Sequence, residues 1–180
     1  MFVPADDTWV IAPFERTAPP RDGDGGRIVS SDYFGALPPE RLRVDRERGV
    51  VLFLADGRYR SKIGLSQARS RPIAASYTRS EKRLSIIRYP VPREPRPYVN
   101  SKWEQQARPF EGDLFNSYNH GTFEPGKLAE VRFYELESSS PGAVLEPGQA
   151  MSHQQQTFHF VGEEAALDAI ATSVLGISLG

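Results

Sequence analysis

The sequence has no cysteine among its 180 residues, so it contains neither disulfides nor thiol nucleophiles nor thiolate metal ligands. Because some secreted proteins also lack cysteine, this absence leaves the compartment unknown. Histidine is scarce too: His120, His153 and His159 show neither the HxH nor the HExxH spacing of metal sites. No metal and no cofactor is therefore predicted.

An excess of either charge is also missing. Lys and Arg number 22, Asp and Glu 23, and the net charge is −1, which gives no electrostatic reason to expect nucleic acid or an anionic membrane as a partner. The first residues, "MFVPADDTWVIAPF", have no basic region and are not expected to be a signal peptide. No window approaches the roughly 18 apolar residues of a transmembrane helix. GxSxG, P-loop and GxGxxG motifs are absent, so nothing argues for a serine hydrolase, an NTPase or a dinucleotide enzyme.

Frequent turns and short apolar segments predict a mostly β protein. Fifteen glycines and fifteen prolines divide the chain, and its length predicts a single domain over 1–180. Alternating or apolar runs predict strands at 8–14, 41–45, 50–56, 57–65, 72–78, 83–90, 114–119, 130–138 and 155–162. Loops are expected at 15–27, 91–113 and 120–127. The fold class predicted is an all-β antiparallel sandwich.

Two local signals refine this architecture. Asp56-Gly57, between two strand-like runs, predicts a hairpin. "VVLFLA" is apolar on both faces, which suits a larger sheet system than a small sandwich and suggests that part of the natural fold is missing.

One helix is predicted, at 163–176, packed on the outside of the sheets. Acidic residues occupy its first turn and Gly176 is placed to end it. Its apolar face is expected to contain Ala166, Leu167, Ile170, Ala171, Val174 and Leu175.

Two carboxylates on one strand are the first candidate site. Glu135 and Glu137 are two positions apart, so their side chains point to the same face of the strand at 130–138. If that face is enclosed, the neighbouring charges can raise one pKa, and such a carboxyl can serve in proton transfer. A stripe of solvated charges is the alternative.

Aromatic and amide side chains gather in two further segments, 98–106 and 116–121. Trp103 and Glu104 belong to the first segment, whereas Asn116, Tyr118 and Asn119 belong to the second. Aromatic faces stack on sugar rings, while amides and carboxylates bind hydroxyl groups, so these segments fit a sugar site. Ordinary loop chemistry is the alternative, because Asn, Ser and Gly favour turns.

Three cations, Arg58, Arg60 and Lys62, share one face of the strand at 57–65. They could bind an anionic group or pair with the glutamates. A solvated strand face is the alternative.

The segment 134–160, "YELESSSPGAVLEPGQAMSHQQQTFHF", resembles the galactose mutarotase-like (aldose epimerase) group. The matching elements are Leu136-Glu137-Ser138, Pro141, the turn Leu145-Glu146-Pro147-Gly148 and Phe160. Along nearly the whole chain, "DYFG", "DGRYRSKIGL", "YVNSKWE", "NSYN" and "YELESSSP" are similar to an uncharacterised bacterial family allied to these mutarotases.

The resemblance implies a role for Glu137. In mutarotase chemistry, a glutamate at this position takes the proton of the anomeric hydroxyl while a histidine protonates the ring oxygen. That histidine belongs to an N-terminal half with no counterpart here, so the chain is expected to be a C-terminal half with its N-terminal half missing. Related sequences also have His and Arg where this chain has Gln155 and Gln156, which favours binding over catalysis.

The resemblance thus implies a partial galactose mutarotase-like supersandwich with one C-terminal helix and a small-molecule sugar as its ligand. Glu137 is the expected catalytic residue of an aldose 1-epimerase-type isomerase. The cleft is expected to be lined by Glu135, Trp103, Glu104, Asn116, Tyr118, Asn119, Arg60, Lys62 and His153. The alternatives are a non-catalytic carbohydrate-recognition module, an inactive truncated fragment, or a plain interaction protein.

Overall fold

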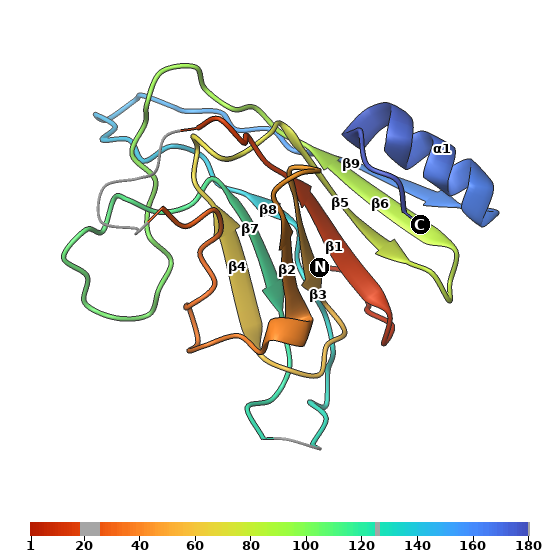
Figure 1. Ribbon diagram of the computed structural model, residues 1–180. Coiled ribbons are helices and arrows are strands. Elements are labelled where there is room, and N and C mark those ends of the chain that lie inside the picture. Colours follow the sequence, from red (N-terminus) through yellow and green to blue (C-terminus); the bar gives the residue numbers. More distant parts are fainter. Residues whose placement is uncertain (19–25, 125–126, 180) are drawn as a thin grey trace.

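Two antiparallel sheets and one helix make up the computed structural model (Figure 1). It describes residues 1–18, 26–124 and 127–179; residues 19–25 of the expected loop 15–27 and residues 125–126 of the expected loop 120–127 lie outside this description. The prediction of an all-β antiparallel sandwich with one C-terminal helix is confirmed.

The larger sheet has six strands, and each strand is antiparallel to its neighbours. In spatial order they are β2 (Leu42–Asp45), β3 (Val50–Leu54), β1 (Thr8–Pro13), β5 (Ile73–Thr78), β6 (Arg83–Arg88) and β9 (Gln156–Val161). The strands predicted at 72–78 and 83–90 pair across the turn between them, since Thr78 lies opposite Arg83. A short 3-10 helix, η1 (Pro39–Arg41), precedes β2.

The smaller sheet has three strands in the order β4 (Ser61–Leu65), β7 (Phe115–Asn119) and β8 (Glu137–Ser138). The strand predicted over 130–138 is shorter than expected: only its last two residues form β8. Tyr134 extends the pairing through single bridges to Asn119 and Phe2.

The hairpin predicted at Asp56-Gly57 is wrong. β3 pairs with β1 and β2, whereas β4 pairs with β7, so the chain crosses from one sheet to the other at this point. Buried polar groups fix the crossing. Arg41 Nη1 donates to Asp56 Oδ2 at 3.0 Å, and the Gly57 amide donates to the side-chain oxygen of Asn119 at 2.8 Å. Gly57 does adopt the left-handed backbone typical of turns, with φ of 71°.

Apolar side chains cover both faces of the larger sheet, as the apolar run at 50–54 predicted. One core lies between the sheets and includes Val10, Phe53, Ile63, Phe115 and Tyr134. The other core lies on the opposite face, beneath α1 (Glu164–Leu175) (Figure 1).

The helix confirms most of its predicted pattern. Leu167, Ala171 and Leu175 are buried against the sheet, and Gly176 ends the helix with φ of 71°. Ala166 and Val174 are exposed, so the apolar stripe is narrower than predicted. Within the described ranges, no helix combines the length and hydrophobicity that a membrane crossing needs.

Candidate functional site

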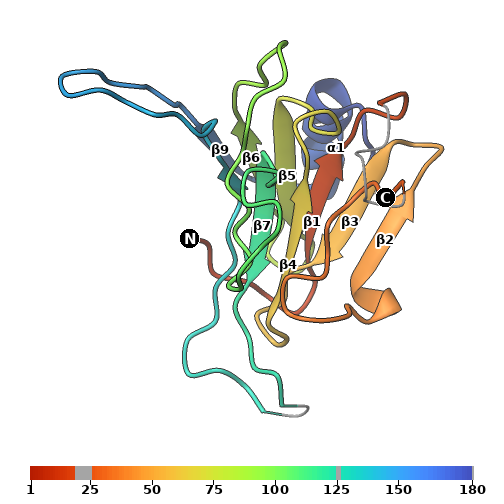
Figure 2. The same cartoon turned by 90° about the vertical axis from the view of Figure 1, so that its left-hand side faces the viewer.

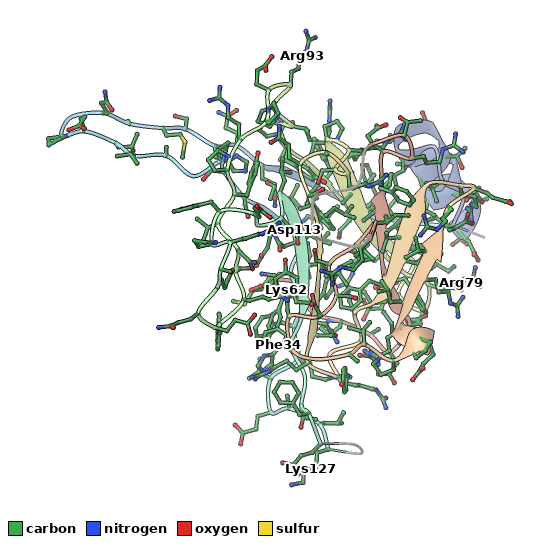
Figure 3. The ribbon with its side chains drawn as sticks, turned by 60° about the vertical axis from the view of Figure 1, so that its left-hand side comes forward. Phe34, Lys62, Arg79, Arg93, Asp113 and Lys127 are labelled. Atoms are coloured by element: carbon green, nitrogen blue, oxygen red, sulfur yellow. The ribbon has the colours of Figure 1, made fainter. Side chains whose placement is uncertain are left out.

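The smaller sheet has one apolar face and one polar face. Ile63 and Phe115 point into the core between the sheets. Because side chains alternate along a strand, Lys62, Asn116 and Tyr118 point the other way. Figure 3 shows Lys62, Phe34 and Asp113 on this side of the molecule, away from Arg79. The face of the smaller sheet that points away from the core is thus polar, whereas the face of the larger sheet beneath α1 is apolar.

The strand register aligns the predicted residues in two rows. Lys62 lies opposite Tyr118, whose carbonyl accepts a 2.8 Å hydrogen bond from the amide of Glu135. In the next row, Asn116 lies opposite Glu137. These five residues, Lys62, Asn116, Tyr118, Glu135 and Glu137, are called the polar face below. The structure thus brings together residues that are up to 75 positions apart in the sequence.

Lys62 and the two neighbouring carboxyls Glu135 and Glu137 lie at the centre of the polar face. Lys62 Nζ lies 3.6 Å from Glu137 Oε2, and the Lys62 side chain is only 13% exposed. Burial, followed by a hydrogen bond with Glu137 and the charge of Glu137, raises the pKa of Glu135 to about 7. The raised pKa of Glu135 fits a partly enclosed face, on which the Glu137 side chain is 38% exposed. At neutral pH the pair therefore offers both a proton donor and a proton acceptor.

A half-buried tyrosine and a buried aspartate border the polar face. Tyr33 donates a 2.6 Å hydrogen bond to Asp113 Oδ2, and the Tyr33 hydroxyl lies 3.3 Å from Asn116 Oδ1. Lys62 Nζ lies 5.4 Å from the centre of the Tyr33 ring. Gly64 makes room for this arrangement, because a Cβ there would lie 2.3 Å from Asp113 Oδ2 and 2.7 Å from the Tyr33 hydroxyl.

Aromatic rings form the other border. The Tyr118 hydroxyl lies 3.0 Å from His120 Nδ1, and the His120 ring stacks on Phe133 at 4.6 Å. Burial, together with the charge of Arg60, lowers the pKa of His120 below its ordinary value. The same burial raises the pKa of Tyr118. Both groups are therefore neutral hydrogen-bonding partners at neutral pH.

Three exposed or half-exposed rings extend this border outward. The Phe34 ring lies 5.8 Å from Tyr118, 6.2 Å from Phe123 and 6.4 Å from Trp103. The Arg60 guanidinium lies above Phe123 at 5.2 Å. Trp103 is 90% exposed and Phe123 is 53% exposed. These rings offer stacking surfaces beside the carboxylates.

Three residues predicted to line the site lie elsewhere. Asn119 is fully buried on the opposite face, where its Nδ2 donates to the Tyr59 carbonyl at 2.8 Å. Glu104 is exposed on the loop 91–113. His153 Nε2 lies 2.9 Å from the hydroxyl of Ser138, which points to the face of β8 opposite Glu137.

The glutamine at position 155 supports the strand that carries Glu137. Its Oε1 accepts a 2.9 Å hydrogen bond from Ser138, and its Nε2 donates to the Leu136 carbonyl at 3.2 Å. Nowhere in the described ranges do three histidine or acidic side chains gather in a way that could hold a metal ion.

Sequence reasoning missed five contributors to this site: Tyr33, Phe34, Gly64, Asp113 and His120. Tyr33 and Phe34 belong to "DYFG", which entered only through the resemblance. His120 lies two residues after Tyr118 and shares its strand parity, which predicts that both side chains point to the same face. No local sequence pattern predicts the contact between Asp113 and Gly64, because it depends on the tertiary fold.

Comparisons with known proteins identify one family. The model of a family of unknown function, DUF6786, matches residues 1–180, so the chain belongs to that family. No curated protein and no solved structure matches the chain.

Proposed function

We propose that this member of the DUF6786 family binds a sugar on the polar face and catalyses the interconversion of its anomers. One observation carries the proposal: Glu135 and Glu137 lie side by side next to Lys62 and near exposed aromatic rings, with the pKa of Glu135 raised to about 7. The similarity of "YELESSSP" to galactose mutarotase-like sequences supports the same assignment for Glu137. A mutarotase-like supersandwich is part of this proposal.

The reaction needs an acid and a base at the two ends of one O–C–O unit. In the ring-opening step, Glu137 removes the proton of the anomeric hydroxyl while Glu135 donates a proton to the ring oxygen. The bond between the anomeric carbon and the ring oxygen breaks, and the anomeric carbon becomes an aldehyde. Rotation of the aldehyde followed by the reverse proton transfers closes the ring on either face. No co-reactant is consumed.

The two carboxyls suit these roles because their surroundings differ. Lys62 Nζ lies 3.6 Å from Glu137 Oε2. Glu135 has a pKa of about 7, so half of it is protonated near neutral pH. Glu135 thereby supplies the acid partner that the resemblance placed in a missing half. A bound sugar would replace the hydrogen bond between the carboxyls with one bond to each.

The remaining groups of the site suit the hydroxyl groups and the apolar C–H face of a sugar ring. Tyr118 provides a hydrogen-bonding group for hydroxyls, whereas Asn116 is 3% exposed and bonds to Tyr33 and Asp113. Phe34 and Trp103 provide faces for the C–H side of a ring.

Exchange spectroscopy of anomeric protons by NMR, with a panel of aldoses, tests the enzyme. We expect the wild-type protein to accelerate exchange, and Glu137→Gln and Glu135→Gln each to lose about 100-fold or more of that acceleration. Glu104→Gln is the matched control, because it removes an exposed carboxylate from the loop 91–113 and should leave the rate unchanged. Absence of acceleration with every aldose would refute the catalytic assignment.

A second function, carbohydrate recognition without catalysis, is favoured by the openness of the aromatic border, where Trp103 is 90% exposed. Catalytic sites usually exclude water, whereas lectin-like surfaces stay open. Sugar-induced NMR shift changes that weaken at least about fivefold in Trp103→Ala, without any rate acceleration, would establish this second function. If sugars cause neither shift changes nor rate acceleration, both the catalytic and the recognition function are rejected.

A further inference from the structure

Strand β9 forms one edge of the larger sheet and carries no charge. Val161 is 75% exposed, and of the strand's six residues only Phe160 is partly buried. The sequence contains no Lys, Arg, Asp or Glu from Pro147 to Gly162. Edge strands usually carry charges, prolines or bulges that prevent pairing with another chain. The opposite edge, β2, is guarded in this way by Arg43 and Asp45.

The backbone of β9 presents a regular row of hydrogen-bonding groups outward. The Gly162 amide donates to the carbonyl of Lys82 directly opposite, at 3.1 Å. Because bonded and non-bonded pairs alternate in an antiparallel ladder, Thr157, His159 and Val161 direct their N–H and C=O groups away from β6. Their positions match the spacing that an added antiparallel strand requires.

An exposed segment leaves the body beside this edge. Every residue from 143 to 152, called the arm below, is exposed. Val144 is 93% exposed, and Leu145 and Met151 are also exposed. Figure 2 shows the arm projecting beyond the side of the sheet that β9 occupies. Apolar side chains on a projecting segment mark an interaction surface.

We propose that β9 pairs antiparallel with β9 of a second copy of this chain, about a two-fold axis, and that each arm packs against the partner. A second copy fits because an uncharged strand meets itself without like-charge repulsion. A charged partner segment would find no countercharge on this edge. The two-fold contact uses the same patch on both copies and closes, so it yields a dimer with a continuous sheet rather than a fibre.

Sedimentation velocity at increasing protein concentrations tests the dimer. We expect a monomer–dimer equilibrium in the wild-type protein. Val161→Pro removes one outward donor without removing a bond to β6, and Val161→Lys places a cation on the uncharged edge of each copy. Each variant should raise the dimer Kd at least about tenfold. Circular dichroism should show both variants folded, and Val161→Lys keeps the test valid if the proline variant unfolds.

Val44→Lys is the matched control, since Val44 is an exposed valine on the other edge, in β2. It should leave the dimer Kd unchanged. Replacing the arm by a Gly-Ser linker of equal length should weaken the dimer. A wild-type protein that remains monomeric at every concentration overturns the proposal, and so does a dimer that survives both Val161 variants or dissociates in Val44→Lys.

Discussion

The two sheets differ in what they expose, although they share one core. The larger sheet is covered by the smaller sheet on one face and by α1 on the other, and its central strands β1 and β3 contain no charged residue. The smaller sheet packs against the larger sheet with one face, and each of its strands places polar side chains on the other. The comparison assigns stability to the larger sheet, whereas the proposed sugar site lies on the smaller one.

Truncation of a central side chain should give the largest effect. Phe53→Ala, in β3, removes a fully buried ring from the core between the sheets. It should lower the free energy of unfolding by about 4 kcal/mol, since such truncations leave a cavity. Urea unfolding followed by circular dichroism measures this change.

Phe123→Ala is the control for Phe53→Ala, because Phe123 is 53% exposed at the border of the polar face. It should change the free energy of unfolding by less than about 1 kcal/mol. Equal losses from the two variants would contradict the division between the sheets.

A methyl group at Gly64 should give an intermediate effect. The added Cβ in Gly64→Ala collides with Asp113 and Tyr33, so these side chains must move. The free energy of unfolding should fall by about 2 kcal/mol, as expected for overpacking, and sugar-induced NMR shifts should weaken.

Gly162→Ala tests whether the loss at Gly64 is specific, because a Cβ at Gly162 meets nothing within 4 Å. Its free energy of unfolding should stay within about 1 kcal/mol of wild type. A Gly64→Ala protein as stable as Gly162→Ala would show that Asp113 and Tyr33 are not held in place.

The smallest effect should come from pH. The pKa of Glu135 is raised in the folded protein, from 4.5 to about 7. The protonated carboxyl therefore contributes stability that is fully present below pH 4.5 and lost as the pH rises through about 7. The loss should be about 1–2 kcal/mol, because one pKa unit corresponds to about 1.4 kcal/mol and partial exposure reduces the full value.

Urea unfolding at a series of pH values, compared between wild type and Glu135→Gln, isolates this contribution. The difference between the two proteins should change with pH through the neutral range. A constant difference would mean that the pKa of Glu135 is not raised. If Glu135 is also the catalytic acid, the rate of anomer exchange should fall over the same pH range.

Local patterns predicted the elements whose partners are close in sequence. β5 and β6 follow each other across a four-residue turn, and the apolar spacing and Gly176 define the helix. The Asp56-Gly57 prediction was wrong because turn chemistry fixes the backbone of Gly57 but not the partner of the next strand. That partner follows from burial: the apolar residues of β3 require cover on both faces, whereas β4 buries Ile63 on one face and places Lys62 beside Glu137 on the other.

Strand parity predicts which residues of one strand share the polar face. Glu135 and Glu137 share a parity, as do Asn116 and Tyr118, and each pair lies on the polar face. Asn119 is three positions from Asn116, so its opposite parity could have excluded it. Tyr33 and Asp113 could not have been paired from the sequence, because each comes from a loop and they meet only in the folded protein.

The strand order of the smaller sheet has a consequence for folding. Lys62 in β4 and its neighbour Tyr118 in β7 are 56 positions apart, and most of the larger sheet forms from the chain between and before them. Bringing such distant segments together costs loop-closure entropy, which nearby pairings such as β5 with β6 largely avoid. The groups of the polar face should therefore assemble after local pairs such as β5 with β6 have formed.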